Sequence, residues 1–138
     1  MEHGTWYQVT VRIAADLLSP GEISRLLELT ATTTRRKGEC VDAISDGSRY
    51  GTNLWIMSGT VDERVPFEDQ MAPLLDTLEE RAEALTALLS LPGVEGELLL
   101  GFGGPGTEGS VCFSPSLLRR IGALGLSIQL DLYPVPGL

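Results

Sequence analysis

Apolar and polar residues alternate strictly near both ends of the chain. Residues 6–13 (WYQVTVRI) and residues 126–133 (LSIQLDLY) each place a mainly apolar set of side chains on one side and a mainly polar set on the other. Successive side chains of a β-strand point to opposite faces, so this pattern predicts two half-buried strands. A sheet built from such strands packs one face on a core and leaves the other face in water.

Three helical segments are predicted between these strands. Residues 19–22 (SPGE) have the form of a capping box, with proline at the first helical position. Residues 67–89 keep apolar side chains at helical spacing over about six turns, and Pro73 lies inside that segment. Because proline cannot donate a backbone hydrogen bond, we expect a kink or two helices in tandem. Residues 114–115 (SP) begin the third helical segment.

Short strands are predicted at residues 32–36, 54–57, 97–102 and 110–113, the last two as a hairpin. The element order is then β-α-β-β-α-β-β-α-β, in one domain of residues 1–138 with residues 134–138 as a C-terminal tail. This order favours the α+β class, with a mixed or antiparallel sheet and helices packed on one face. The helices that follow Ser19 and Ser114 share a cap and an apolar stripe, so two ferredoxin-like half-units are an alternative.

The charge of the chain restricts its partners. Its 19 acidic and 10 basic side chains give a formal net charge of −9, which repels nucleic acids and anionic membrane surfaces. We therefore expect neither as a partner. The first residues (MEHG) show no basic region followed by an apolar one, and two widely separated cysteines suit a reducing compartment. These features indicate a cytoplasmic protein.

Several kinds of chemistry find no support in the sequence. His3 is the single histidine of the chain, so histidine-based acid–base catalysis and a zinc-ligand set both lack residues. Gly101, Gly103 and Gly106 match the spacing of a dinucleotide fingerprint, but a predicted strand follows them where a helix should begin. We expect no catalytic residues, no metal and no cofactor, and the balance leans against an enzyme.

Candidate binding residues are cationic, aromatic or acidic. Arg35, Arg36 and Lys37 form the basic run of the chain, which suits an anionic ligand or pairing with the protein's own acidic residues. Arg12 and Asp131 would pair across the open face if the first and last strands were neighbours.

Trp6 and Tyr133 fall on the polar side of the two alternating strands, where they suit an interface or a ligand wall. The alternative is ordinary packing, and Trp55 is the aromatic residue that we expect to be buried. Acidic residues are concentrated in residues 62–83. Glu79, Glu80 and Glu83 are candidates for an acidic partner-binding surface, although adjacent carboxylates of this kind more often form a solvated helix face.

The chain resembles an uncharacterised bacterial family of about this length, grouped as a domain of unknown function. The resemblance rests on residues 19–23 (SPGEI), on residues 36–39 (RKGE) before Leu54 and Trp55, and on residues 91–94 (LPGV). It also rests on residues 113–115 (FSP), 126–128 (LSI) and 131–133 (DLY). The family implies no catalytic residues, and some small acidic proteins of this general kind look like immunity factors that neutralise a toxin.

Two functions from different classes follow. The first is a non-enzymatic module that binds another protein, in an immunity-like role. The second is a site for a small anionic ligand, or an unrecognised enzyme, on the open sheet face. The sequence leaves the ligand, the partner and the subunit number open, with a homodimer among the alternatives.

Overall fold

The computed structural model describes residues 4–41, 48–59, 62–104 and 111–134, which form five strands and four helices. The strands are β1 (Trp6–Ala15), β2 (Thr33–Arg35), β3 (Asn53–Ser58), β4 (Val94–Gly104) and β5 (Ser127–Pro134). The helices are α1 (Pro20–Leu27), α2 (Phe67–Glu79), α3 (Ala82–Leu89) and α4 (Pro115–Ala123). This architecture confirms the predicted α+β class.

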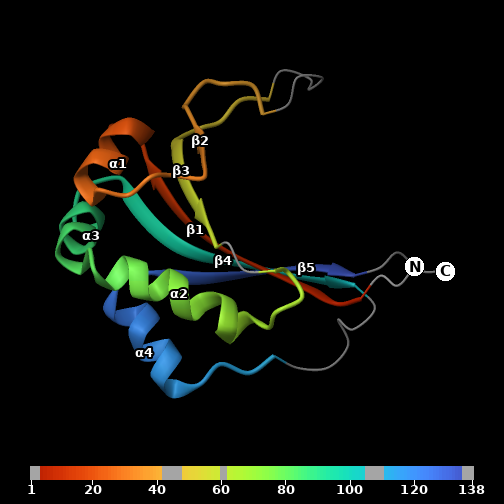
Figure 1. Cartoon of the computed structure of the whole chain (residues 1–138). Coiled ribbons are helices and arrows are strands. Elements are labelled where there is room, and N and C mark those ends of the chain that lie inside the picture. The colour runs from red at the N-terminus through yellow and green to blue at the C-terminus, as the bar shows by residue number, and fades with distance from the viewer. Residues whose placement is uncertain (1–3, 42–47, 60–61, 105–110, 135–138) are drawn as a thin grey trace.

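The five strands form one sheet in the order β2-β3-β1-β4-β5 (Figure 1). β1 pairs antiparallel with both β3 and β4, and β2 pairs antiparallel with β3. β4 and β5 are parallel, so the sheet is mixed, as predicted. The parallel pair requires a crossover, which α4 makes. The first and last strands are therefore not neighbours, because β4 lies between them.

One face of the sheet carries the core. Val11 and Ile13 of β1 and Leu98 of β4 are fully buried on this face, and the helices pack against it (Figure 1). On the opposite face Gln8 and Gln129 are exposed. Alternation along the strands thus separates an apolar, helix-covered face from a polar face in water. We call the second face the open face.

The predicted helix starts are formed as local hydrogen bonds. Ser19 Oγ accepts from the backbone N–H of Glu22, and the Glu22 carboxylate accepts from the backbone N–H of Ser19. These two bonds complete the capping box at α1. At α4, Ser114 Oγ accepts from the backbone N–H of Leu117. In both helices proline follows the cap, where its missing N–H is not needed.

The long helical segment is two helices, but they separate at Glu80–Arg81 rather than at the proline. Pro73 lies inside α2 and is exposed, so the carbonyl one turn earlier can bond to water. Thr77 Oγ1 donates to the Pro73 carbonyl oxygen at 3.1 Å. The tandem arrangement was predicted correctly, and the proline is not its cause. Among the described helices, none combines the length and the apolar character needed to cross a membrane.

Besides small shifts at the ends of several strands, the structure differs from the prediction at the expected hairpin and at the C-terminal tail. Of the expected hairpin strand at residues 110–113, the described residues 111–113 belong to no strand. β1 and β5 occupy the two edges of β4, so a returning hairpin strand would have no edge to pair with. Pro134 is the last residue of β5, although it was assigned to the C-terminal tail.

The two strand–helix–strand units are connected differently. β1 and β2 are separated in the sheet by β3, whereas β4 and β5 are direct neighbours. The first unit is thus split, as in a ferredoxin-like half, and the second is a contiguous parallel pair. The two capped helices are alike in their starts but not in the strands that they join.

Candidate functional site on the open sheet face

The sheet register brings five of the predicted site residues to the open face. Residues that pair across neighbouring strands project from the same side of a sheet. Gly103 of β4 pairs with residue 6 on one side and residue 133 on the other, and the same register continues to β2 through β3. The residues on this face are Trp6, Arg12, Arg35, Asp131 and Tyr133.

Trp6 lies flat over two glycines of β4. A Cβ atom placed on Gly103 would lie 2.4 Å from Trp6 Cζ2, and one placed on Gly101 would lie 3.3 Å from Trp6 Cζ3. The first distance is far below van der Waals contact, so the indole occupies the space that a side chain at Gly103 would need. An aromatic ring that covers glycines of a neighbouring strand compensates for their missing side chains. Trp6 is therefore held in one place.

Tyr133 extends this aromatic surface. The Trp6 and Tyr133 ring centroids are 5.4 Å apart with an interplanar angle of 32°, within the range of favourable aromatic pairs. Tyr133 is 53% exposed, so much of its ring faces solvent. Asp131 precedes it by two residues on the same side of β5 and accepts a hydrogen bond from Gln129 Nε2 at 3.2 Å. A carboxylate thus lies beside an accessible π surface. We call Trp6, Tyr133 and Asp131 the aromatic–acidic patch.

Arg12 does not pair with Asp131. Its guanidinium forms an ion pair with Glu97, directly opposite on β4, and Arg12 Nε donates to Glu97 Oε1 at 2.8 Å. Asp131 is in register with Gly101, four residues further along β4, which corresponds to about 13 Å along the strand. The expected Arg12–Asp131 contact is wrong because β4 lies between the two strands and supplies a closer carboxylate.

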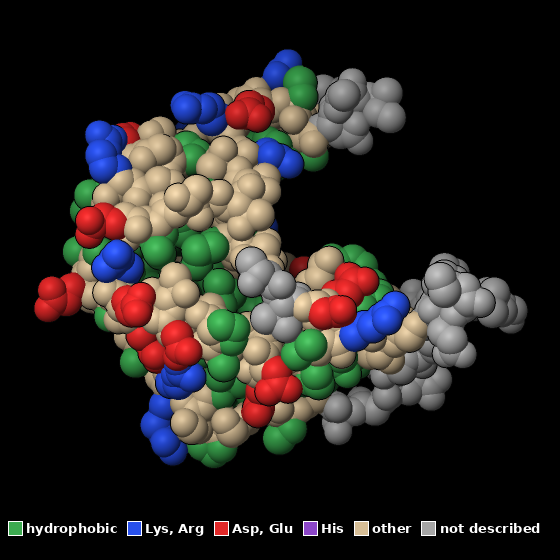
Figure 2. Space-filling model, in the orientation of Figure 1, with side chains coloured by type: hydrophobic (Ala, Val, Ile, Leu, Met, Phe, Trp, Pro, Cys, Tyr) green, Lys and Arg blue, Asp and Glu red, His purple; other side chains and the backbone are tan. Residues whose placement is uncertain are grey.

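The basic run does not converge on one point. Arg35 is on β2, and its Nε donates to the Tyr50 hydroxyl at 3.1 Å. Arg36 and Lys37 follow the strand and are exposed, and their backbone N–H groups donate to the side chains of Glu39 and Asn53, respectively. Figure 2 shows a hollow between the part of the molecule that contains β2 and the part that contains α2.

Arg35 is also far from the aromatic–acidic patch. It is in register with Ala14 through β3, whereas Asp131 is in register with Gln8, six residues away along β1 and so about 20 Å distant along the strands. An anionic-ligand site needs cations that converge. This arrangement therefore gives that hypothesis little support.

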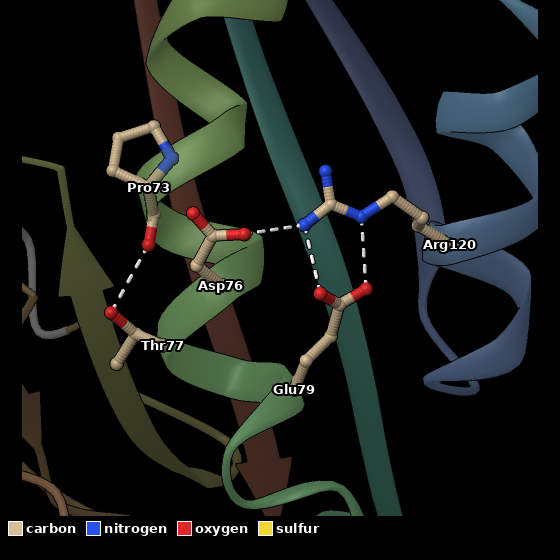
Figure 3. A network of polar contacts seen from close by, with 5 residues as sticks. All are labelled: Pro73, Asp76, Thr77, Glu79 and Arg120. Atoms are coloured by element: carbon tan, nitrogen blue, oxygen red, sulfur yellow. Dashed lines mark hydrogen bonds and ion pairs between the residues drawn. The ribbon is translucent and has the colours of Figure 1, made fainter.

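The acidic surface of α2 is partly neutralised by α4. Figure 3 shows the Arg120 guanidinium between two carboxylates, with Nε 2.9 Å from Glu79 Oε2 and Nη2 2.8 Å from both Asp76 Oδ1 and Glu79 Oε1. Glu80 and Glu83 are exposed, and no ion pair to them is seen within the described residues. Of the three predicted acidic residues, Glu79 therefore joins two helices, and the other two face water.

The Arg120 contacts change the ionisation of their partners. The hydrogen bonds from Arg120 hold the pKa of Glu79 below its usual value, because they favour the charged carboxylate. The hydrogen bonds to Glu79 and Asp76 raise the pKa of Arg120. This ion pair is a structural contact between α2 and α4, and it competes with any partner for the same carboxylate.

Gln70 has a structural role that the sequence did not indicate. β3 pairs with β1 only as far as Thr10, so the first residues of β1 lack a strand on that side. The buried Gln70 Nε2 donates to the carbonyl oxygens of Tyr7 at 2.7 Å and Val65 at 2.8 Å, and the Tyr7 N–H donates to the Glu63 carbonyl at 2.6 Å. The chain before α2 and one amide side chain thus replace the missing strand. An isolated glutamine inside an amphipathic helix gives no signal of this role.

A cavity of about 350 Å³ adjoins this part of the β1 edge. Its lining combines residues 7–10 of β1 and residues 58–59 at the end of β3 with Glu63 and Gln70. The described residues contain no group of three or more His, Cys, Asp or Glu side chains placed to hold a metal ion. The aromatic–acidic patch is therefore the better-defined candidate site, because its side chains are held in position and reach solvent, with Tyr133 exposed and Trp6 and Asp131 half-buried.

The comparisons with known proteins identify a family but no individual related protein or structure. No curated protein and no solved structure matches the chain significantly. The family model described as "Domain of unknown function (DUF4279)" matches residues 5–135. The match includes all five strands and all four helices described above. The chain therefore belongs to the uncharacterised DUF4279 family.

Proposed function

We propose that the protein is a binding module that uses the aromatic–acidic patch to hold a basic segment of another protein. The observation that carries this proposal is the ring pair of the half-buried Trp6 and the exposed Tyr133. Trp6 is fixed over Gly101 and Gly103, which we call the glycine floor, and Asp131 lies on the same face. A guanidinium or ammonium group over an aromatic ring is attracted by the ring quadrupole, and a neighbouring carboxylate adds a charge-assisted hydrogen bond.

The rigidity of the patch favours binding. The glycine floor limits the positions of the Trp6 ring before a partner arrives, because the indole packs directly on the backbone of β4. A side chain that is already ordered loses little conformational entropy when it is covered. Tryptophan and tyrosine are also the residues that most often dominate the energetics of protein interfaces.

The charges around the patch favour a cation from the partner. Arg12, the cation nearest along the open face, is occupied by Glu97 and lies about 13 Å along the strand from Asp131. The net charge of −9 attracts a basic surface over a longer range and raises its association rate. Arginine fits better than lysine, since its planar guanidinium stacks on a ring and bonds a carboxylate at the same time.

The immunity-like form of the proposal is that the partner is a toxin enzyme with a basic surface. Cys40 and Cys112 are both free and exposed thiols, which is compatible with action in a reducing cytoplasm. Co-expression of the chain with a toxin encoded beside it tests this form. Growth that depends on Tyr133 and Asp131 supports it, whereas protection that survives Tyr133→Ala with Asp131→Asn rejects the patch as the site.

A peptide titration tests the binding proposal directly. We expect an arginine-rich hexapeptide to shift the NMR resonance of the Trp6 indole N–H, and a matched citrulline peptide, which lacks the charge, to leave it unchanged. Asp131→Asn should weaken binding by roughly 5- to 30-fold, from the loss of a charge-assisted bond of about 1–2 kcal/mol.

Glu83→Gln is the matched control for Asp131→Asn. It also removes one exposed negative charge, but it does so on α3, away from the aromatic rings. An equal loss of affinity in the two variants would mean that only the net charge attracts the peptide. A titration that shifts residues of α2 and α3 but not Trp6 would instead assign binding to the acidic surface of Glu80 and Glu83.

A further inference from the structure

The two edges of the sheet are of different kinds. At one edge β2 has three residues, and its Arg35 is charged. At the other edge β5 has eight residues that pair with β4 in an unbroken register, and no described strand lies beyond it. Natural sheets protect an edge with short strands, charges, prolines or bulges. β2 has two of these protections, whereas β5 has few.

β5 also exposes apolar side chains. Ile128, Leu130 and Leu132 are in register with the buried Leu98, Leu100 and Phe102 of β4, so they point to the helix-covered side of the sheet. Their exposed fractions are nevertheless 37%, 44% and 58%. Residues 127–133 include no lysine, arginine or proline, and Asp131 carries their one charge. A long apolar edge of this type is expected to pair with another strand.

We propose that two copies of the chain pair through β5, antiparallel, about a two-fold axis at Leu130. In this register Leu130 of one copy faces Leu130 of the other, and Ile128 faces Leu132. On the open face, Gln129 of each copy faces Asp131 of its partner. All residues from 127 to 133 then have a cross-strand neighbour, and the two sheets join into one.

The sequence of β5 selects this register over its neighbours. An axis at Asp131 would place two carboxylates directly opposite each other, which is destabilising. An axis at Gln129 would pair Ile128 with Leu130 and place Leu132, the most exposed of the three apolar side chains, opposite Leu126, which precedes β5 and is already buried in its own copy. The axis at Leu130 places an amide opposite a carboxylate in two pairs on the open face. On the helix side it places each apolar side chain opposite another apolar side chain. Gln129 Nε2 already donates to Asp131 within one copy, so the groups have matching polarity.

A two-fold axis perpendicular to the sheet keeps the faces of the two copies aligned. Side chains on the helix side of one β5 then meet helix-side residues of the other, and the two open faces become one continuous surface. The dimer would therefore present two aromatic–acidic patches on the same side. This inference does not depend on the binding proposal, because it rests on the pairing of β5 with itself and not on contact with a basic partner, although both use Asp131.

A cysteine at the axis tests the register. Cys40 and Cys112 are exposed and would be replaced first, as Cys40→Ser and Cys112→Ser. In that background Leu130→Cys should form an intermolecular disulfide under mild oxidation, because facing residues lie about 4.5–5.5 Å apart, within disulfide reach. Leu132→Cys is the matched control, since its two copies would be four residues out of register, about 13 Å apart.

Sedimentation of the wild-type chain tests the dimer itself. We expect a dimer at micromolar concentration. A second pair of variants changes one position only: Gln129→Glu places a carboxylate opposite Asp131 and should weaken the dimer roughly 2- to 30-fold, whereas Gln129→Lys should strengthen it by a similar factor.

The outcomes separate clearly. Cross-linking at Leu130→Cys but not at Leu132→Cys, with opposite effects of the two Gln129 variants, supports the proposed dimer. A chain that sediments as a monomer at 100 µM, on the order of the concentration used for NMR, overturns it. Cross-linking at residue 132 rather than 130 overturns the register. Circular dichroism of each variant confirms that the fold is retained.

Discussion

Gly103→Ala is expected to destabilise the protein, and Trp6→Ala is expected to reverse the sign of that effect. The backbone of Gly103 does not have the left-handed φ that requires glycine, so alanine is compatible with its conformation. The obstacle is the indole, because the new Cβ would lie 2.4 Å from Trp6 Cζ2. The ring must therefore move off β4, away from Tyr133.

The size of the effect follows from two opposing terms. Overpacking of this kind costs about 1–3 kcal/mol of unfolding free energy. Alanine in a strand is more favourable than glycine by about 0.5–1 kcal/mol, because glycine loses more conformational freedom on folding. With Trp6 present the first term is larger and the protein is less stable. Without the indole only the second term remains, so Gly103→Ala should stabilise the Trp6→Ala protein. The coupling energy between the two sites is about 1–3 kcal/mol.

Urea unfolding of the four proteins, followed by circular dichroism, measures this cycle without depending on tryptophan fluorescence. Gly104→Ala is the control, since its Cβ would lie 2.6 Å from the Gly4 carbonyl oxygen and its φ is +96°. Removal of Trp6 cannot relieve that backbone contact. If Gly103→Ala changed stability by the same amount with and without Trp6, the indole would not be packed on the glycine floor.

Three further effects are expected. Ser24→Ala leaves the N–H of the fully buried Trp55 indole, 2.9 Å from Ser24 Oγ, without its acceptor, and should cost about 1–3 kcal/mol in urea unfolding. Gln70→Ala leaves the carbonyl groups at the β1 edge unpaired and removes packing, and should cost about 2–4 kcal/mol in the same assay. Glu79→Gln should remove part of the acid sensitivity of thermal unfolding. The pKa of Glu79 is lowered in the folded state, so its contribution is present above pH 4.5, the usual value, and is lost as pH falls through the folded value.

Each of these effects has a result that would contradict it. Equal losses from Ser24→Ala and from Ser90→Ala, an exposed site, would show that the Trp55 hydrogen bond contributes nothing specific. Unchanged hydrogen exchange at the β1 edge in Gln70→Ala would mean that water replaces the amide. If acid lowered the midpoint of thermal unfolding equally in wild type and in Glu79→Gln, the Arg120 ion pair would be excluded as a source of the pH dependence of stability.

The composition of the open face was predictable because strand side chains repeat every two residues. Trp6, Asp131 and Tyr133 were assigned to the polar side of their strands, and the register brings them together. The order of the strands was not predictable in the same way. Whether β5 lies beside β1 or β4 depends on the α4 crossover, which is a tertiary property, so the predicted partner of Arg12 was wrong.

Some sequence patterns were interpreted wrongly because one pattern suits two different structural roles. Gly101 and Gly103 were rejected as a phosphate-binding loop because no helix followed, and their role as a floor for Trp6 was missed. The signal was present in the combination: alternate glycines in one strand and a tryptophan on the polar side of another. Pro73 similarly suggested a helix break, but its exposed position allows α2 to continue.

The position of β5 in the chain has a consequence during synthesis. β4 contributes buried residues over most of its length, yet the strand that covers one of its edges is translated after α4, as the last strand of the sheet. Until the residues of β5 have left the ribosome, the nascent chain carries the apolar strand β4 with the backbone hydrogen-bonding groups of one edge unpaired. Stalling or truncation between α4 and β5 should therefore yield polypeptide that aggregates or recruits chaperones, even though most of the domain has already been made.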